Sequence, residues 1–501
     1  MSDSPLTLTL DMGSSSTRVL LWDTQGREVE GVHAQLPYTM HTTQDGGVEI
    51  PAEELLGYVM TCVDQALAQA GDRARAIRAV GISTFWHSLL GVDGEGNPLT
   101  PIYSWADARS GDVARRLRKD LDAEAIHKRT GCVIHPSYYP AKLVWLRETQ
   151  PDLFTRVKRW ISPSEYLFRR WFGAQEMRVS VSMASGTGLF HQEKCGWDTE
   201  TLTTLQIAPE TLSPIVDLRQ SAQGLSAELA QRWPALKDVP FFPAVGDGAC
   251  GNIGSGCDSP DRLAINLGTS GAIRAVWDET NAPDTTRAPI PDGLWRYRVD
   301  SRRPIIGAAF SDGGIVYAYL TRILKLPPEE DLQKQLAAFE PGEHDVICLP
   351  FLAGERSMGW HPDAHGAVTG LNLDTTAVEI LRGAMEAVAL RFALAARSLH
   401  LFFPKANEIV ASGGALGHSP IWTQMFCDAL GQPLTLAEEA EASSRGAALL
   451  AMEAAGLIDR TSDAVARTGQ TFQPDAARHR RYQELLDLQQ ELYSKIIGPV
   501  V

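Results

Sequence analysis

Two segments far apart in the chain repeat one short pattern, in which glycine, serine and threonine stand between two apolar runs. Residues 11–23 read Asp-Met-Gly-Ser-Ser-Ser-Thr-Arg-Val-Leu-Leu-Trp-Asp, residues 266–278 read Asn-Leu-Gly-Thr-Ser-Gly-Ala-Ile-Arg-Ala-Val-Trp-Asp, and the two align without a gap. Each pattern predicts a β-hairpin whose turn directs backbone N–H groups and hydroxyls to one point, which suits a phosphate oxygen. Two ordinary Gly/Ser hairpins are the alternative, but the shared Trp-Asp ending favours a duplicated chain that grips one polyphosphate from both sides.

A carboxylate lies just ahead of the first turn. Asp11 stands two residues before Gly13, where the first apolar run ends. A carboxylate at this place is suited to hold Mg²⁺ through water beside bound phosphates. Taken alone, an aspartate here is more typical of the start of a turn, and it is the neighbouring phosphate-binding turn that favours the metal role.

A second carboxylate, Asp247, lies in the segment 246–251, which matches the GxGxxG pattern of dinucleotide-binding proteins. The carboxylate of Asp247 would face and repel a pyrophosphate, so we interpret the glycines as a tight turn into a helix. Asp247 would then project into a cleft between domains and accept the proton of a substrate hydroxyl, as the base does in phosphoryl transfer. A simple helix cap, worth ~1 kcal/mol, and a dehydrogenase that binds NAD are the alternatives.

Two clusters of aromatic and polar residues follow strand-like runs. Trp86 and His87 form the first, and Trp105, Asp107 and Arg109 belong to the second. The face of a tryptophan packs against the C–H face of a carbohydrate, and a histidine bonds a hydroxyl, so both clusters indicate a sugar site. Such residues are otherwise often core and rim, and Arg109 serves equally as a solvated charge at a helix start or as a partner for a carboxylate.

Composition limits the class of protein. The chain has 501 residues, 44% hydrophobic and 21% charged, with a net charge of −15. This length suggests two or more domains, and the acidic balance argues against a nucleic-acid partner, although a local site with a metal ion would still admit an anionic substrate. Seven cysteines without a CxxC pair, and no evident secretory signal or transmembrane run, indicate a cytoplasmic protein with no membrane partner.

The elements that would position these residues alternate between strands and helices, which is typical of α/β layers. A junction with two prolines at 237–243 precedes a restart of the pattern, so we place the domain boundary near residue 245. Strands are expected at 6–10, 19–22, 77–83, 89–92 and 407–411, and helices at 51–71, 109–121, 377–399, 443–456 and 482–497.

Together these motifs resemble the FGGY family of carbohydrate kinases, and the resemblance runs from end to end. The turn after Asp11 resembles the family's first phosphate loop, 268–271 resembles its second, and 245–248 resembles the stretch that carries the catalytic aspartate. The resemblance implies two duplicated actin-like (ribonuclease H-like) ATPase domains with an interdomain cleft. Residues 1–245 would form the N-terminal, sugar-binding domain, and residues 246–501 the C-terminal, nucleotide-binding domain.

The resemblance also implies ATP as the phosphoryl donor and Mg²⁺ as the cofactor. The segment 412–415 with His418 resembles the adenosine side of the family's nucleotide site, and 312–314 resembles its other wall. The expected site has Asp247 as base, Asp11 at the metal, Trp86, His87, Trp105 and Asp107 at the sugar, and Gly13, Ser14, Ser15, Arg18, Gly268, Thr269, Ser270, Gly313, Gly314, Gly414 and His418 at the nucleotide.

Within the family, five further segments resemble gluconate kinases, which implies phosphorylation of D-gluconate to 6-phosphogluconate. The segments are 87–90, 105–110, 131–136, 142–148 and 354–357 with Trp360.

The chain departs from that pattern at four places. Trp86 replaces a methionine, 137–140 read Ser-Tyr-Tyr-Pro in place of Met-Ser-Pro-Leu, Met358 replaces a proline, and Gly383 stands where Ala or Ser is usual. The first three lie in or near the expected sugar pocket. A kinase for xylulose or another ketose or polyol is therefore the first alternative, and an actin-like nucleotide switch without sugar kinase activity is the second. The oligomeric state is left open, a homodimer included.

Overall fold

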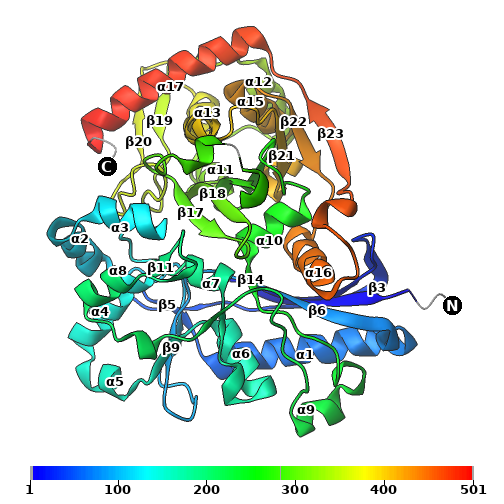
Figure 1. Cartoon of the computed structure of the whole chain (residues 1–501). Coiled ribbons are helices and arrows are strands. Elements are labelled where there is room, and N and C mark those ends of the chain that lie inside the picture. Colours follow the sequence, from blue (N-terminus) through cyan, green and yellow to red (C-terminus); the bar gives the residue numbers. More distant parts are fainter. Residues whose placement is uncertain (1–3, 283, 499–501) are drawn as a thin grey trace.

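A computed structural model describes residues 4–282 and 284–498. Figure 1 shows two lobes, one formed mainly by the first half of the chain and the other by the second. Each lobe contains one large sheet. In order across the sheet, the first contains β14 (Val245–Gly246), β6 (Ile77–Thr84), β1 (Leu6–Met12), β2 (Ser16–Trp22) and β3 (Glu28–Pro37). The second contains β17 (Trp295–Arg298), β18 (Pro304–Phe310), β16 (Gly271–Val276), β15 (Arg262–Leu267), β21 (Glu408–Ser412), β22 (Leu434–Ala437) and β23 (Thr468–Phe472).

The two sheets repeat one topology, which confirms the predicted duplication and the α/β class. The predicted hairpins are β1 with β2 and β15 with β16, both antiparallel. In each lobe the next strand, β3 or β18, adds antiparallel to the second strand of the hairpin. On the other side, β6 or β21 adds parallel to the first strand of the hairpin, and β14 or β22 adds parallel beyond it.

The strands of the first hairpin are covered on both faces, although β1 alternates leucine with threonine and only β2 ends in a continuous apolar run. The repeated tryptophans lie in the cores of their lobes, Trp22 as the last residue of β2 and Trp277 directly after β16, and each is 1% exposed. The indole nitrogen of Trp22 donates to the Thr9 hydroxyl at 2.9 Å, and the ring of Trp277 packs against Phe403.

All five predicted helices are present, and their ends follow local signals. Helix α1 runs from Ala52 to Ala70, between Pro51 and Gly71. Helix α17 begins at Ala476 rather than near Tyr482, because the Asp475 carboxylate caps the N–H groups of the first turn, a start signal that the apolar pattern alone did not show. The other helices of the first half are α2 (Gly111–Asp120), α3 (Ala123–Thr130), α4 (Tyr139–Thr149), α5 (Pro151–Arg156), α6 (Pro163–Phe172), α7 (Val181–Ser185), α8 (Thr199–Leu205), α9 (Ala227–Arg232) and α10 (Asp247–Gly254). Those of the second half are α11 (Gly314–Ile323), α12 (Glu329–Ala338), α13 (Ala377–Phe402), α14 (Gly414–Gly417), α15 (Pro420–Leu430), α16 (Ala442–Ala455) and α17 (Ala476–Ile496). Within 4–282 and 284–498, none of the helices combines the length and the apolar character that a membrane crossing requires.

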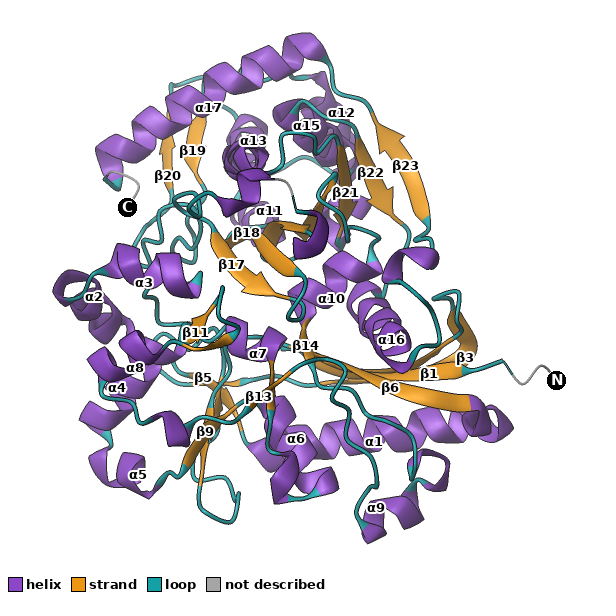
Figure 2. Cartoon of the chain, viewed as in Figure 1, coloured by secondary structure: helices purple, strands orange, loops and turns teal. Residues whose placement is uncertain are grey.

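Helix α16 lies late in the sequence but packs in the first lobe. Figure 2 shows α1 along one side of the first sheet and α16 along the other, in contact with β1 and β6. The side chains of residues 447–452 belong to the hydrophobic core of that lobe, and Ser444 hydrogen-bonds Thr9 at 2.6 Å. The domain boundary near residue 245 therefore stays a prediction, because α16 follows that residue in the sequence but packs in the first lobe.

Glycines let α16 approach α10 closely. A Cβ added to Gly446 would lie 1.9 Å from the carbonyl oxygen of Cys250, and one added to Gly254 would lie 1.8 Å from that of Ala442. No side chain fits at these distances, so the two helices are joined through their backbones. This contact joins the middle and the end of α10 to the first turns of α16.

Replacing Gly446 with alanine is expected to lower the free energy of unfolding by about 1–3 kcal/mol, as overpacking of a core does. Urea unfolding followed by circular dichroism measures it. Gly57→Ala is the matched control, because Gly57 lies on the exposed side of a helix with nothing within 4 Å of an added Cβ, and alanine there is expected to stabilise by up to about 1 kcal/mol. Equal effects of the two substitutions would contradict the close helix contact.

Candidate active site

Two adjoining cavities lie where the lobes meet, and both hairpins contribute to them. The larger cavity has a volume of about 600 Å³, and the smaller one about 210 Å³. Asp247, Asn266 and Arg274 line both cavities, so they stand at the boundary between them. Of the residues predicted from sequence, the larger cavity brings together Asp11, Arg18, Asp247, Gly414 and His418, and the smaller one Ser14, Trp86, His87, Trp105, Asp247 and Ser270.

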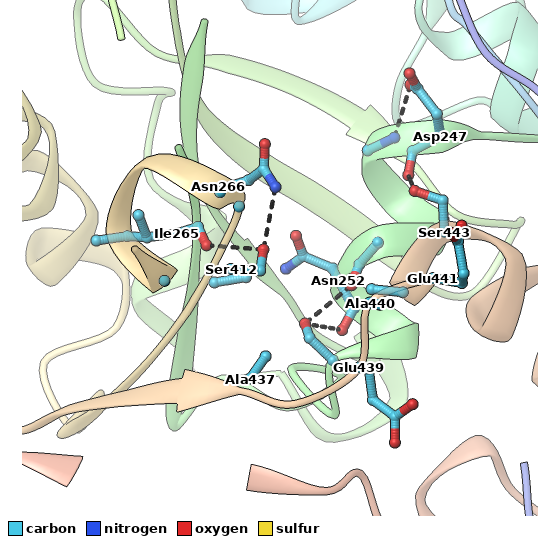
Figure 3. A pocket seen from close by; sticks show the side chains of 18 of the residues that line it. Asp247, Asn252, Ile265, Asn266, Ser412, Ala437, Glu439, Ala440, Glu441 and Ser443 are labelled. Carbon is cyan, nitrogen blue, oxygen red and sulfur yellow. Dashed lines mark hydrogen bonds between the residues drawn. The ribbon is translucent and has the colours of Figure 1, made fainter. Parts of the chain in front are cut away.

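Asp247 is the first residue of α10 and follows the short strand β14. One oxygen of its carboxylate accepts the Gly248 N–H at 2.7 Å, and the Ser443 hydroxyl donates to its backbone carbonyl at 3.3 Å (Figure 3). Burial raises the pKa of Asp247 to about 6, an effect that the Arg274 guanidinium opposes and the Asp11 charge strengthens. A carboxylate with this pKa is ionised near neutral pH and still basic enough to take a proton in a transition state.

Asp11 lies near the end of β1, directly opposite Arg18 on β2. The residue is 4% exposed, and burial raises the pKa of its carboxyl group, an effect that the Ser83 hydroxyl and Arg18 oppose. Arg18 Nη1 lies 3.5 Å from Asp11 Oδ2, and Arg18 Nε lies 3.5 Å from Glu441 Oε2. Arg18 therefore bridges the first hairpin and the segment before α16. Among the described residues no group of three or more histidine, cysteine or acidic side chains is placed to hold a metal. A single carboxylate of this kind suits Mg²⁺, which keeps several waters when it also binds phosphates.

The two predicted phosphate turns present their tips at the interlobe surface. The exposed residues at these tips are Ser14, Ser15, Thr269 and Ser270. A backbone hydrogen bond closes each turn, from the Gly13 N–H to the Ser16 carbonyl at 2.9 Å and from the Gly268 N–H to the Ser270 carbonyl at 3.0 Å.

Gly313 and Gly314 support the second turn from behind rather than line either of the two cavities. The N–H of Gly314 donates to the carbonyl of Gly268 at 2.7 Å, and that of Gly313 donates to the carbonyl of Thr269 at 3.2 Å. Gly313 and Gly314 therefore contact the second turn, and the turn lies between them and the predicted nucleotide site.

The far wall of the larger cavity is formed where β21 leads into α14. Ser412 donates to the Ile265 carbonyl at 3.2 Å and accepts from the Asn266 amide at 3.1 Å, which fixes this corner against β15 (Figure 3). Gly414 and His418 follow on the same wall and are exposed to the cavity side.

The smaller cavity has an aromatic floor. Trp86 is 5% exposed, and its indole N–H donates to the Ser182 carbonyl at 3.0 Å. Gly246 packs directly under it, since a Cβ there would lie 1.9 Å from the indole ring. The first glycine of the GxGxxG pattern therefore makes room for a tryptophan. Trp295 and Tyr297 of β17 complete the floor, stacked at 4.1 Å between ring centroids.

Asp107 is the predicted sugar residue that the structure does not bring to this cavity. Its carboxylate pairs with Arg109 at 2.5 Å and accepts the Val48 N–H at 3.2 Å, and the residue is 2% exposed. Arg109 also pairs with Glu49, so neither member of this pair is free for a ligand. Trp105 does line the cavity, with the Arg356 guanidinium 5.4 Å from its ring.

Sequence reasoning missed Arg274 and Arg356 as site residues. Both line the smaller cavity, and within residues 4–282 and 284–498 neither is at ion-pair distance from a carboxylate. The Nε atom of each is buried without a hydrogen-bond partner. A signal for Arg274 was present: it occupies the place in the second repeat that Val19 occupies in the first, a charge in a strand that is otherwise apolar.

Comparison with known proteins gives a consistent result. The model of the N-terminal domain of the FGGY family of carbohydrate kinases matches residues 6–254, and that of the C-terminal domain matches residues 263–455. A gluconokinase of Bacillus subtilis is 28% identical over 477 residues, which cover 93% of this chain and 90% of that protein. Two solved structures from Lactobacillus acidophilus, a gluconate kinase and a ligand-bound xylulose kinase, each match with a TM-score of 0.89 and 25% identity over 99% of both chains.

Proposed function

The chain belongs to the FGGY family of carbohydrate kinases, and we propose that it phosphorylates a sugar acid, D-gluconate, to 6-phosphogluconate. It is thus an ATP-dependent carbohydrate kinase, and the proposal concerns its substrate. The observation that carries the proposal is the charge of the smaller cavity. Arg274 and Arg356 face it without a paired carboxylate among the described residues, and the one acidic side chain that lines it is Asp247.

A substrate with a carboxylate would balance the excess positive charge of the smaller cavity. Two guanidinium groups against one ionised aspartate leave one excess positive charge in a partly buried site, and buried charge is costly unless it is paired. An aldonate carboxylate accepts charge-assisted hydrogen bonds from guanidinium groups, which are about twice as strong as neutral ones. A neutral sugar would leave the excess charge in place.

The remaining residues suit phosphoryl transfer between the two cavities. The sugar would lie on the aromatic floor of the smaller cavity with its reacting hydroxyl at Asp247, which accepts the proton. The two turns and Arg18 would hold the β- and γ-phosphates of ATP, whose adenosine would lie along the wall with Gly414 and His418. Asp11 would hold Mg²⁺ through water, and the ion would supply positive charge against the phosphates of ATP. This reaction depends mainly on positioning and charge stabilisation, which a site shared by two lobes supplies.

The relatives support gluconate and also name the alternative. The B. subtilis relative is a gluconokinase and one matching structure is a gluconate kinase, but a xylulose kinase structure matches with the same TM-score. A xylulose kinase is therefore the second candidate, and the two unpaired guanidinium groups are what favour gluconate over it.

A substrate panel tests the proposal. ADP release is measured with Mg·ATP and D-gluconate, D-xylulose or glycerol, and kcat/KM for gluconate is expected to exceed that for either neutral compound by about 10- to 100-fold, since a charge-assisted pair contributes about 1.5–3 kcal/mol. Turnover of xylulose with none of gluconate would overturn the assignment. ADP release that no sugar stimulates would favour the nucleotide switch instead.

Replacing Asp11 with alanine is expected to raise the Mg²⁺ concentration for half-maximal activity by about 10- to 100-fold, the usual cost of losing a group that holds a metal or its waters. The measurement is a Mg²⁺ titration at a fixed total concentration of ATP, with ADP release as the readout. Glu441→Gln is the matched control, because it removes the other carboxylate at Arg18 and leaves Asp11 intact. An unchanged metal dependence of Asp11→Ala would count against the metal role.

A further inference from the structure

Lys142 is a buried cation behind the smaller cavity that the proposed reaction does not use. It lies on α4 and is 1% exposed. Its ammonium group donates to two backbone carbonyls, that of Ser137 at 2.7 Å and that of His87 at 3.2 Å. Across residues 4–282 and 284–498, no carboxylate comes within ion-pair distance of it. Lysine is almost never fully buried without such a partner, so this position needs a reason.

The two carbonyls belong to segments that shape the cavity. His87 has φ of +63°, in the left-handed region that a non-glycine residue rarely adopts, and it follows Trp86 in the aromatic floor. Tyr138, next to Ser137, hydrogen-bonds Tyr297 of the same floor. One ammonium therefore ties together both first-lobe segments that support the floor, and it holds the strained backbone of His87.

The surroundings of Lys142 are mostly cationic or neutral. Burial lowers the pKa of Lys142 to about 7, opposed by Asp107 and strengthened by Arg356 and Arg109. Asp107 offers little compensation, because its carboxylate is bound to Arg109. Burial also lowers the pKa of each nearby imidazole well below its usual value, so both are neutral at physiological pH; these are His87 and His135.

We propose that Lys142 is a positioning residue that holds the floor of the smaller cavity through its ammonium group, and that binding of an anionic substrate in this cavity is coupled to uptake of a proton by Lys142. The inference rests on the proposed function, since it requires a substrate with a carboxylate. No carboxylate among the described residues pairs with Lys142, so the negative charge of the substrate would stabilise the protonated form of this lysine.

The sign of the pH dependence follows from linkage. Above about pH 7 the free protein holds Lys142 largely neutral, so an anion must bring a proton with it, and its affinity falls by up to about tenfold per pH unit. A neutral sugar gains nothing from the extra charge, and its affinity stays level over the same range. The KM for gluconate should therefore rise with pH while kcat does not.

Calorimetric titration of the full chain with gluconate, without nucleotide, tests the coupling. At about pH 8, in two buffers of different ionisation enthalpy, the wild type is expected to take up more than about half a proton per gluconate bound. Lys142→Met should bind with no uptake. Asp247→Asn is the matched control, because it removes the carboxylate that lines the cavity and titrates near this range, and uptake is expected to persist in it.

The outcomes separate the two proposals. Gluconate binding without proton uptake in the wild type, or uptake that persists in folded Lys142→Met, overturns the role of Lys142 and leaves the substrate assignment standing. If gluconate neither binds nor is turned over, the substrate assignment fails, and the inference fails with it. If Lys142→Met does not fold, Lys142→Arg replaces it: its guanidinium keeps its charge at this pH, so it is expected to bind gluconate without uptake, and uptake would contradict the inference.

Discussion

Asp247→Asn is expected to lower kcat by about 10²- to 10⁴-fold, the range that a positioned general base contributes. The amide is nearly isosteric with the carboxylate but cannot take the proton of the sugar hydroxyl. The Gly248 N–H that now donates to the carboxylate can donate to the amide oxygen instead, so the start of α10 is expected to be kept. ADP release measures turnover, and calorimetry measures nucleotide affinity, which is expected to stay within about twofold because the phosphates are held by other groups.

The pH profile gives an independent test of the same residue. Burial raises the pKa of Asp247 to about 6, and the base is active only when it is ionised. Log kcat/KM for gluconate is therefore expected to rise by about one unit per pH unit below pH 6 and to level off between about pH 6 and 7, above which the loss of the Lys142 proton lowers it. In Asp247→Asn this rise should disappear from the residual activity. Near-native turnover of the variant, or an unchanged acid limb, would show that another group is the base.

Replacing Arg356 with glutamine is expected to cut kcat/KM for gluconate by about 10- to 100-fold, since a hydrogen bond to a charged group contributes about 1.5–3 kcal/mol. For any neutral sugar that the wild type turns over, the loss should stay within about threefold, because no charge pair is removed. Both guanidinium groups lower the pKa of Asp247, and we choose Arg356 because the effect of Arg274 is the larger. A change of Arg274 would alter the proposed base more strongly.

Arg115→Gln controls for the loss of a positive charge elsewhere in the protein. Arg115 lies on α2, pairs with Asp363 at 2.8 Å and lines neither cavity. Its substitution is expected to leave both activities unchanged within experimental error. If Arg356→Gln lowers activity on gluconate and on a neutral sugar to the same extent, Arg356 shapes the cavity rather than recognising a charge.

Elements with strong local signals were predictable from the chain. The two hairpins were found because their apolar runs and Gly/Ser turns are contiguous in sequence, and α1 was found because Pro51 and Gly71 mark its ends. The placement of Trp86, His87, Asp11 and Asp247 along the interlobe site followed from the same local logic. Each of them stands at the end of a strand or the start of a helix, where side chains leave the layers of an α/β fold.

Contacts between distant segments were not predictable in this way. Asp107 was expected at the sugar, but it is bound by Arg109 and by the Val48 N–H, and Val48 lies far from it in the sequence. The return of α16 to the first lobe depends on backbone contacts with α10 at Gly254 and Gly446, and single-sequence periodicity does not report which element a helix meets.

By itself, the sequence determined the duplicated α/β plan, the two turns and the aspartates beside them, because these depend on hydrogen bonds and side-chain directions within a few residues. Only the tertiary structure decided the charge of the smaller cavity. The sequence does not show whether an arginine or a lysine is paired. In the part of the chain that the structure describes, the fold places no carboxylate within ion-pair distance of Arg274, Arg356 or Lys142.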